Sequence, residues 1–254
     1  MLHKEKQGAK KKMHGLGTLI NVLAIIIGGL IGIVCGRFIK DRHRDALCKA
    51  CGLAVIFIGA AGTLSRMLSL EGGRITYGGD FLIIGCLALG ALVGEIINIE
   101  GGFERLGAWL KQKTNSTKDG NFINGFLNAS FTVCIGAMAI VGSINDGLYG
   151  DYTVLVTKSI LDFIIIMIMA ASLGKGTIFS AIPVAILQGG VTALSVLIKP
   201  IMTETALLYL SVVGNILIFC VGINLVFGKK IKVANMLPAI IFAVACAFLP
   251  VSLI

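Results

Sequence analysis

Charged side chains are scarce in this chain. They make up 14% of the residues, whereas an ordinary soluble domain carries about a quarter. No polar segment is long enough to fold as a soluble domain of its own. The scarcity of charge therefore excludes a separate soluble domain and indicates that residues 13–254 form one multi-pass transmembrane domain.

Residues that often carry catalysis or hold metals are also few. The three histidines, His3, His14 and His43, lie near the start, outside the deep apolar segments, which excludes His-based metal or Ser–His chemistry from the membrane core. The chain lacks the GxxxxGK[ST] phosphate loop of ATP-driven pumps and the GxGD run of intramembrane aspartyl proteases. Cys48 and Cys51 form a CxxC pair, but no second pair completes a metal site. We therefore expect no enzymatic activity, no cofactor and no metal ion.

Long apolar runs dominate what is present. Hydrophobic residues make up 56% of the chain, the mean hydropathy is +0.94, and 33 residues are glycine. Because about 20 apolar residues in a helix cross a bilayer, the runs predict an all-α membrane protein of about eight transmembrane helices. The predicted helices cover about residues 15–36, 47–68, 79–98, 123–144, 152–173, 177–198, 205–227 and 233–253, the last kinked or started by Pro238.

The longest polar interval, residues 99–121, predicts a short amphipathic helix. Phe103, Leu106, Trp109 and Leu110 recur in it at helical spacing. Two interpretations are open. The helix either lies at the membrane interface with Trp109 as its anchor, or packs on the bundle as a loop helix.

Glycines at a spacing of four predict close helix contacts. Gly28, Gly32 and Gly36 give the first helix a smooth face, and such faces also predict a homo-oligomer. A loose similarity between the apolar segments 79–98 and 205–227 suggests an internal duplication of four plus four helices.

The basic residues predict the orientation of the chain. The net charge is +9, but the charges sit in short connections and form no basic face with interleaved aromatics, so we exclude nucleic acid as a partner. With the first helix starting outside, thirteen basic residues fall inside and only Arg66, Arg74 and Lys199 fall outside. The five lysines of residues 1–12 would then lie on the wrong side. This basic extension is either a start-site artefact, with Met13 as the true start, or is translocated against the rule; we favour the artefact.

Lys158 and Asp162 are the central candidates for function. They lie four residues apart in an apolar segment, so their side chains share one helix face. An unpaired charge in lipid costs several kcal/mol, so we expect the two residues to pair with each other or with groups on neighbouring helices. The pair is either a structural ion pair that pins helix packing, or a site where a proton or cation binds Asp162 in competition with Lys158.

Amides and acids extend this candidate site. Each buried amide needs a partner in the membrane, so the amides are either interhelical glue or the lining of a polar pathway. The segment 143–147 is either a helix-ending turn or, with Asp151, an acidic mouth that concentrates cations. Gln188-Gly189-Gly190 is a candidate helix interruption. The candidate pathway residues are Asn21, Asn128, Asn145, Asp146, Lys158, Asp162, Gln188, Asn215 and Asn224.

Six sequence runs carry a resemblance to a known family. They are GLGTLINVLAIIIGG, CIGAMAIVGSINDGLYGD, KSILD, AILQGG, GNILIFCVGINLV and KVANMLPA, spread from Met13 to Pro250. On these runs the chain resembles the YdfK/YqgA-type family of uncharacterised bacterial integral membrane proteins, DUF554. The resemblance implies a multi-pass protein of the bacterial cytoplasmic (inner) membrane and supplies no established substrate or reaction.

The residues predict a secondary transporter or channel for a small solute or ion. It would work by alternating access around a polar midplane site, with the lipid bilayer and the unidentified solute as its partners. The alternative is a non-transporting structural or regulatory membrane protein.

Overall fold

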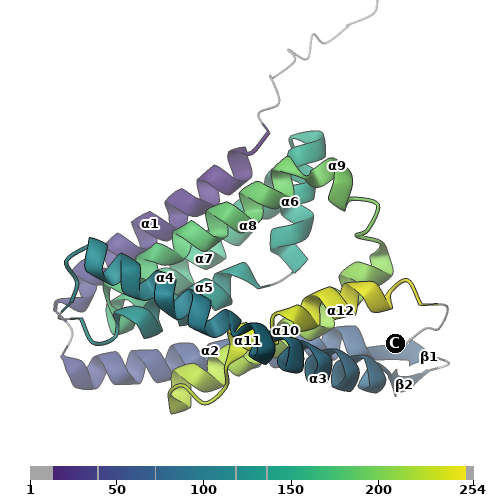
Figure 1. Ribbon diagram of the computed structural model, residues 1–254, viewed down its shortest axis with the longest axis horizontal. Coiled ribbons are helices and arrows are strands. Elements are labelled where there is room, and N and C mark those ends of the chain that lie inside the picture. The colour runs from purple at the N-terminus through teal and green to yellow at the C-terminus, as the bar shows by residue number, and fades with distance from the viewer. Residues whose placement is uncertain (1–13, 39, 72, 118, 136, 250–254) are drawn as a thin grey trace, which may run out of the picture.

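The computed structural model describes residues 14–38, 40–71, 73–117, 119–135 and 137–249, so the basic extension 1–12 lies outside the described residues. The chain is almost entirely helical, as predicted, with one β-hairpin (Figure 1). Its elements are α1 (Leu16–Gly36), α2 (Asp41–Met67), β1 (Leu68–Glu71), β2 (Arg74–Tyr77), α3 (Asp80–Ile97), α4 (Ile99–Lys113), α5 (Phe122–Cys134), α6 (Ala137–Tyr149), α7 (Thr153–Leu173), the 3-10 helix η1 (Lys175–Ser180), α8 (Ala181–Ala193), α9 (Ser195–Ile198), α10 (Glu204–Phe227), α11 (Val233–Met236) and α12 (Pro238–Cys246).

The predicted count of eight membrane-spanning helices is not confirmed. The described residues contain six helices long and apolar enough to cross a membrane, and a seventh if the bent pair α5 and α6 is one span. The last predicted helix is divided and short, at Val233–Cys246. Pro238 is the first residue of α12, as predicted, because proline lacks the N–H group that would continue α11.

The helices form two groups that lie side by side. Figure 1 shows α1, α7 and α8 above α2, α10 and α12, and the most extensive contacts join α1 to α7 and α2 to α10. Helix α4 lies along the outside and packs on α5 and α11. Gly107 and Leu110 of α4 are buried, whereas the Trp109 side chain is exposed. The predicted amphipathic helix is thus present, with its apolar side packed on the bundle.

The glycine face of α1 contacts α7. A Cβ atom added at Gly28 would lie 2.6 Å from the Phe163 carbonyl oxygen, and one added at Gly36 would lie 2.7 Å from that of Ala171. One added at Gly32 would overlap the Met167 carbonyl. The predicted close helix contact is confirmed, within a single chain. A homo-oligomer through glycine faces stays a prediction.

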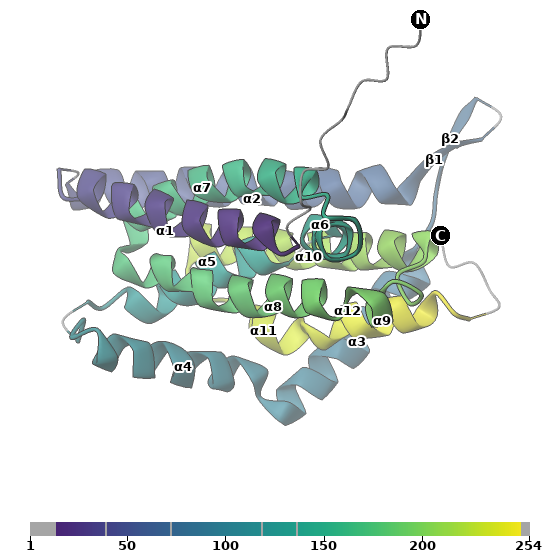
Figure 2. The ribbon, with the colours of Figure 1, turned by 90° about the horizontal axis from the view of Figure 1, so that it is seen from above.

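The chain connections gather at two ends of the bundle (Figure 2). The α1–α2, α4–α5 and α7–η1 connections lie at one end, with the α10–α11 connection set back on the same side, and the hairpin, α6–α7 and α9–α10 connections lie at the other. We call the first the basic end, because Arg37, Lys40, Lys111, Lys113, Lys175, Lys229, Lys230 and Lys232 lie in or beside its connections. The opposite end has Arg66, Arg74 and Lys199. The charge asymmetry read from the sequence therefore matches the geometry, although Lys118 lies outside the described residues.

The β-hairpin was not predicted. Strands β1 and β2 pair antiparallel, with Leu68 opposite Tyr77 and Glu71 opposite Arg74. The two glycines between the strands are a hairpin signal in the sequence, and Gly73 takes a positive φ of 78° in this turn.

The close approach of α3 to α11 predicts an asymmetry between two glycines of α3. A Cβ added at Gly94 would overlap the backbone of Asn235, whereas one added at Gly85 would meet nothing within 4 Å. We expect Gly94→Ala to destabilise the protein by about 1–3 kcal/mol through overpacking. The matched control Gly85→Ala should be neutral or slightly stabilising, because alanine favours a helix. Denaturant unfolding in detergent micelles measures both variants, and equal stabilities would contradict the packing of α3 on α11.

Candidate functional site

Lys158 and Asp162 form an ion pair inside the helix bundle. Both lie on α7, and the Lys158 Nζ atom is 2.5 Å from Asp162 Oδ2. Their side chains are only 8% and 6% exposed. The predicted pair is therefore present, on one face of one helix.

The same lysine reaches a break in the chain between α5 and α6. Lys158 Nζ donates to the carbonyl oxygen of Val133 at 2.8 Å. In an unbroken helix that carbonyl would accept the N–H of residue 137. Helix α5 instead ends at Cys134, and the axes of the two helices differ by 62°. The break thus leaves a backbone acceptor that the lysine ammonium fills.

Two amides from other helices complete the cluster. Asn21 of α1 donates through Nδ2 to Asp162 Oδ2 at 3.0 Å and to Gln188 Oε1 of α8 at 3.2 Å. Both amide side chains are fully buried. Within the described part of the chain, Asn21 Oδ1 and Gln188 Nε2 have no hydrogen-bond partner. We call Asn21, Lys158, Asp162 and Gln188 the central cluster. Its two unpartnered atoms can hold a water molecule or a polar group of a ligand.

Two serines continue the polar atoms along α5 and α6. Ser130 and Ser143 lie on opposite sides of the break, and both hydroxyls are buried without a partner among the described residues. Thr132 donates its hydroxyl to the Asn128 carbonyl at 2.7 Å, so it is satisfied locally. Four of the predicted pathway residues thus meet in the central cluster, and Ser130 and Ser143 lie on the two helices that adjoin the break.

Asp146 has a different position from the one expected for an acidic mouth. It is fully buried and accepts from the backbone N–H groups of Gly15 and Gly17, at 3.2 and 3.0 Å. The carboxylate therefore caps the positive N-terminus of α1. Helix α6 continues through Asn145 and Asp146 to Tyr149, so the predicted helix-ending turn at residues 143–147 is wrong. The helix continues because the Asp146 carboxylate accepts hydrogen bonds from the first N–H groups of α1. It therefore does not bind backbone N–H groups of its own segment, which would favour a turn.

Asn215 and Asn224 do not reach the central cluster. Asn215 donates to Ser211 on its own helix α10 at 3.3 Å and lies against Gly62 of α2. Asn224 binds the backbone of Lys230 and Ile231, which stabilises the turn after α10. Helix α8 also runs without interruption through Gly189 and Gly190, so the interruption expected there lies instead between α5 and α6.

An apolar cavity adjoins the break. Its volume is about 360 Å³, and its lining includes Cys134 and Ile135 at the end of α5, Leu187 of α8 and Leu210 of α10. The unpartnered Ser130 hydroxyl belongs to this lining. The sequence did not predict the cavity, because residues from six helices, α4, α5, α6, α8, α10 and α12, form its walls.

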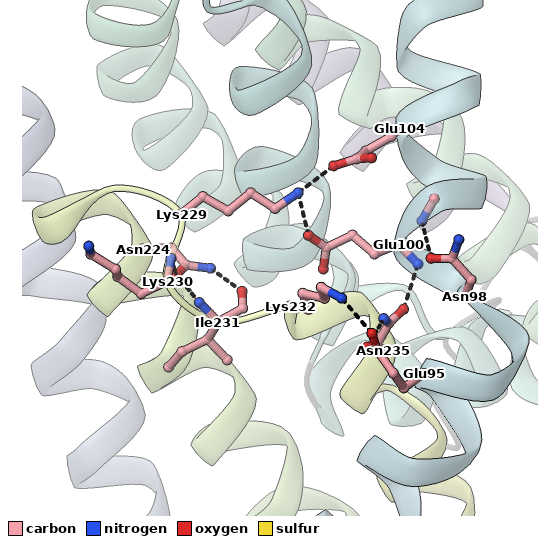
Figure 3. A network of polar contacts seen from close by, with 11 residues as sticks. Glu95, Asn98, Glu100, Glu104, Asn224, Lys229, Lys230, Ile231, Lys232 and Asn235 are labelled. Atoms are coloured by element: carbon pink, nitrogen blue, oxygen red, sulfur yellow. Dashed lines mark hydrogen bonds and ion pairs between the residues drawn. The ribbon is translucent and has the colours of Figure 1, made fainter.

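A second polar network, also missed from the sequence, ties α3 and α4 to the chain after α10 (Figure 3). Lys229 forms ion pairs with Glu100 and Glu104 of α4. Lys232 forms an ion pair with Glu95 at 2.5 Å. Partial burial lowers the pKa of Lys229, but the hydrogen bonds and charges of Glu100 and Glu104 raise it by more, so the net pKa lies above its ordinary value. The sequence signal for this network is the presence of acidic residues at 95–104 and basic residues at 229–232. The sequence does not show that these two distant segments come together, and only the fold pairs them.

Asn235 anchors this network to the backbone. Its Oδ1 atom accepts from the Glu100 N–H at 2.7 Å, and its Nδ2 atom donates to Glu95 at 2.5 Å. Asn98 caps the start of α4 by accepting from the Gly101 N–H at 3.2 Å. The network therefore fixes the corner between α3 and α4. Among the described residues, no group of three His, Cys, Asp or Glu side chains could hold a metal ion.

Comparison with known proteins places the chain in a family. Residues 16–248 match DUF554, described as proteins of unknown function. The chain is 30% identical over 225 residues to the uncharacterized membrane protein YdfK of Bacillus subtilis (strain 168), covering 89% of this chain and 92% of that protein. It is 29% identical over 232 residues to the uncharacterized protein YqgA of Escherichia coli (strain K12), covering 90% of this chain and 94% of that protein. No solved structure matches it. The chain is a multi-pass membrane protein that belongs to the DUF554 family.

Proposed function

We propose that this protein is a secondary transporter or channel for a small solute or ion, with the central cluster as its site. The observation that carries the proposal is the buried Lys158–Asp162 pair, whose ammonium group binds the backbone carbonyl of Val133 beside the break between α5 and α6. Broken helices that expose backbone groups near the midplane are a recurrent feature of ion and solute sites in transporters.

The energetics of buried charge favour a working site over a packing device. A buried ion pair is often no more stabilising than well-packed apolar residues of the same volume. Intramembrane charges are costly and mark ion pathways or proton relays by default. The unpartnered atoms of Asn21 and Gln188 add a further cost that a purely structural contact would avoid.

The geometry gives Lys158 two acceptors, and this suggests a mechanism. When a proton or cation binds Asp162, the ammonium group keeps its bond to the Val133 carbonyl while it releases the carboxylate. Asn21 holds the Asp162 carboxylate toward Gln188 during this exchange. The adjacent cavity gives a solute about 360 Å³ beside the break. Movement of α6 relative to α5 would then expose the site to one side at a time.

The second candidate function is a non-transporting structural or regulatory membrane protein. One observation favours it: both charged groups of the pair are almost fully buried and satisfied within the chain. The two functions predict different outcomes when the charges are removed.

Flux measurements test the proposed site. Proteoliposomes with the wild-type protein should pass protons or a monovalent cation, or a solute from a broad panel. Asp162→Asn should lower this flux at least about tenfold, which corresponds to the loss of about 1.4 kcal/mol of interaction. Lys158→Met should also lower it, because Asp162 then lacks its exchange partner.

The chain offers matched controls for these variants. Asp45 and Lys49 form an ion pair with the same spacing, at 2.7 Å, but their side chains are more than half exposed. Asp45→Asn and Lys49→Met should keep wild-type flux. Wild-type flux in folded Asp162→Asn and Lys158→Met samples would remove the central cluster from the transport mechanism. No flux from the folded wild-type protein with any solute would favour the structural function.

Unfolding measurements give a second prediction for the pair. Each single change, Asp162→Asn or Lys158→Met, should cost about 3–5 kcal/mol, because it leaves one buried group uncompensated. The double variant should recover most of this loss, since neither charge remains, yet it should pass no solute. A double variant that is folded and fully active would contradict the proposal and leave the pair a structural role.

A further inference from the structure

The Glu100 carboxylate is buried with one oxygen unused. Its backbone N–H donates to Asn235 Oδ1, which fixes Glu100 at the first turn of α4 (Figure 3). Its side chain is 5% exposed, and Oε1 lies 2.6 Å from Lys229 Nζ. Its Oε2 atom is buried and has no hydrogen-bond partner in the described part of the chain. A buried carboxylate oxygen without a partner is costly, so it points to a bound species.

A small cavity with both polar and apolar lining residues adjoins this carboxylate. It holds about 20 Å³, close to the space of one water molecule. Its polar lining comes from Glu100, Asn124, Asn128, Asn224 and Lys229. The Asn224 oxygen already accepts two backbone N–H groups. Among the polar lining residues, Glu100, Asn124 and Asn128 are therefore the candidates to offer an oxygen to a ligand.

The local charges favour a cation in this cavity. The single ammonium group of Lys229 pairs with two carboxylates, those of Glu100 and Glu104. Lys232 pairs with Glu95, and the exposed Lys230 side chain points away from Glu100 in Figure 3. The Lys229 side chain is 42% exposed and can turn toward solvent, whereas the Glu100 side chain cannot. When the lysine leaves, a buried negative charge remains.

We propose that Glu100 is the ligand of a monovalent-cation site of Na⁺ size, with Asn124 and Asn128 as further oxygen donors. Carboxylate and amide oxygens are the ligands that hard cations prefer. Glu100 is the one carboxylate among the described residues that line the cavity, so a single positive charge balances it, whereas a divalent ion would leave an excess charge in a buried space. Lys229 occupies the carboxylate when the cation is absent, and the cation releases it. The site lies outside the central cluster and does not require that the protein transports its ligand.

Cation-dependent melting tests the site without any measurement of flux. The purified protein is melted in detergent with NaCl, KCl or choline chloride at equal ionic strength. A ligand that binds the folded state raises the melting temperature with its concentration. We expect the largest rise in Na⁺, a smaller one in the larger K⁺, and none in choline. Glu100→Gln should abolish the Na⁺ effect.

Three further variants keep the test decisive. Glu104→Gln is the matched control, because Glu104 also pairs with Lys229 but does not line the cavity, and it should keep the Na⁺ effect. Lys229→Met should lower the half-saturating Na⁺ concentration about tenfold, since the competing charge is gone. Asn128→Leu removes another of the proposed oxygen donors and should weaken the Na⁺ effect. It tests the site even if Glu100→Gln does not fold.

Equal melting temperatures in the three salts, for both the wild type and Lys229→Met, would overturn the proposal and leave water as the occupant of the cavity. A larger rise in K⁺ than in Na⁺ would contradict the size of the site. Either result would leave the function proposed for the central cluster unaffected, because that function is tested by flux.

Discussion

An ammonium group inside a membrane-spanning bundle needs a negative partner and further acceptors, because the bilayer core supplies neither. Lys158 finds them in Asp162 and in the Val133 carbonyl. The arrangement of the neighbouring helices follows from this requirement. The break between α5 and α6 supplies the carbonyl, α1 brings Asn21 to the carboxylate, and α8 brings Gln188 to Asn21. The buried ammonium group of Lys158 and the break between α5 and α6 therefore occupy the same place.

Polar side chains elsewhere replace the water that a soluble protein would use at helix ends. Asp146 binds the first N–H groups of α1, and Asn224 closes the turn after α10. Asn235 joins the start of α4 to Glu95 on α3. These contacts span long stretches of sequence, so they fix the bundle as well as single helices. Several residues that look like pathway candidates by composition thus have structural roles, which concentrates the functional hypothesis on the central cluster and on Glu100.

The sequence predicted much of the helical framework, because long apolar runs and glycine spacing are local properties. Helices α1, α3, α7 and α10 begin and end within a residue or two of their predicted limits. The division of residues 123–144 into α5 and α6, and of the last segment at Pro238, changed the number of spanning helices. Apolar composition is insensitive to such breaks, because the residues on both sides are equally hydrophobic. The cavity of about 360 Å³ could not be predicted from apolar composition either, because its walls come from segments that are distant in the sequence.

The sequence by itself determined the class of the protein, its charge asymmetry and the shared helix face of Lys158 and Asp162, since residues four apart on a helix share a face. Only the tertiary structure decided which amides join that pair. Asn21 and Gln188 do, whereas Asn215 and Asn224 on α10 are satisfied elsewhere. It also decided that Glu100 meets Lys229. Each of these outcomes depends on which helix faces pack together, and in an almost uniformly apolar chain that choice is made by shape and by a few long-range polar contacts.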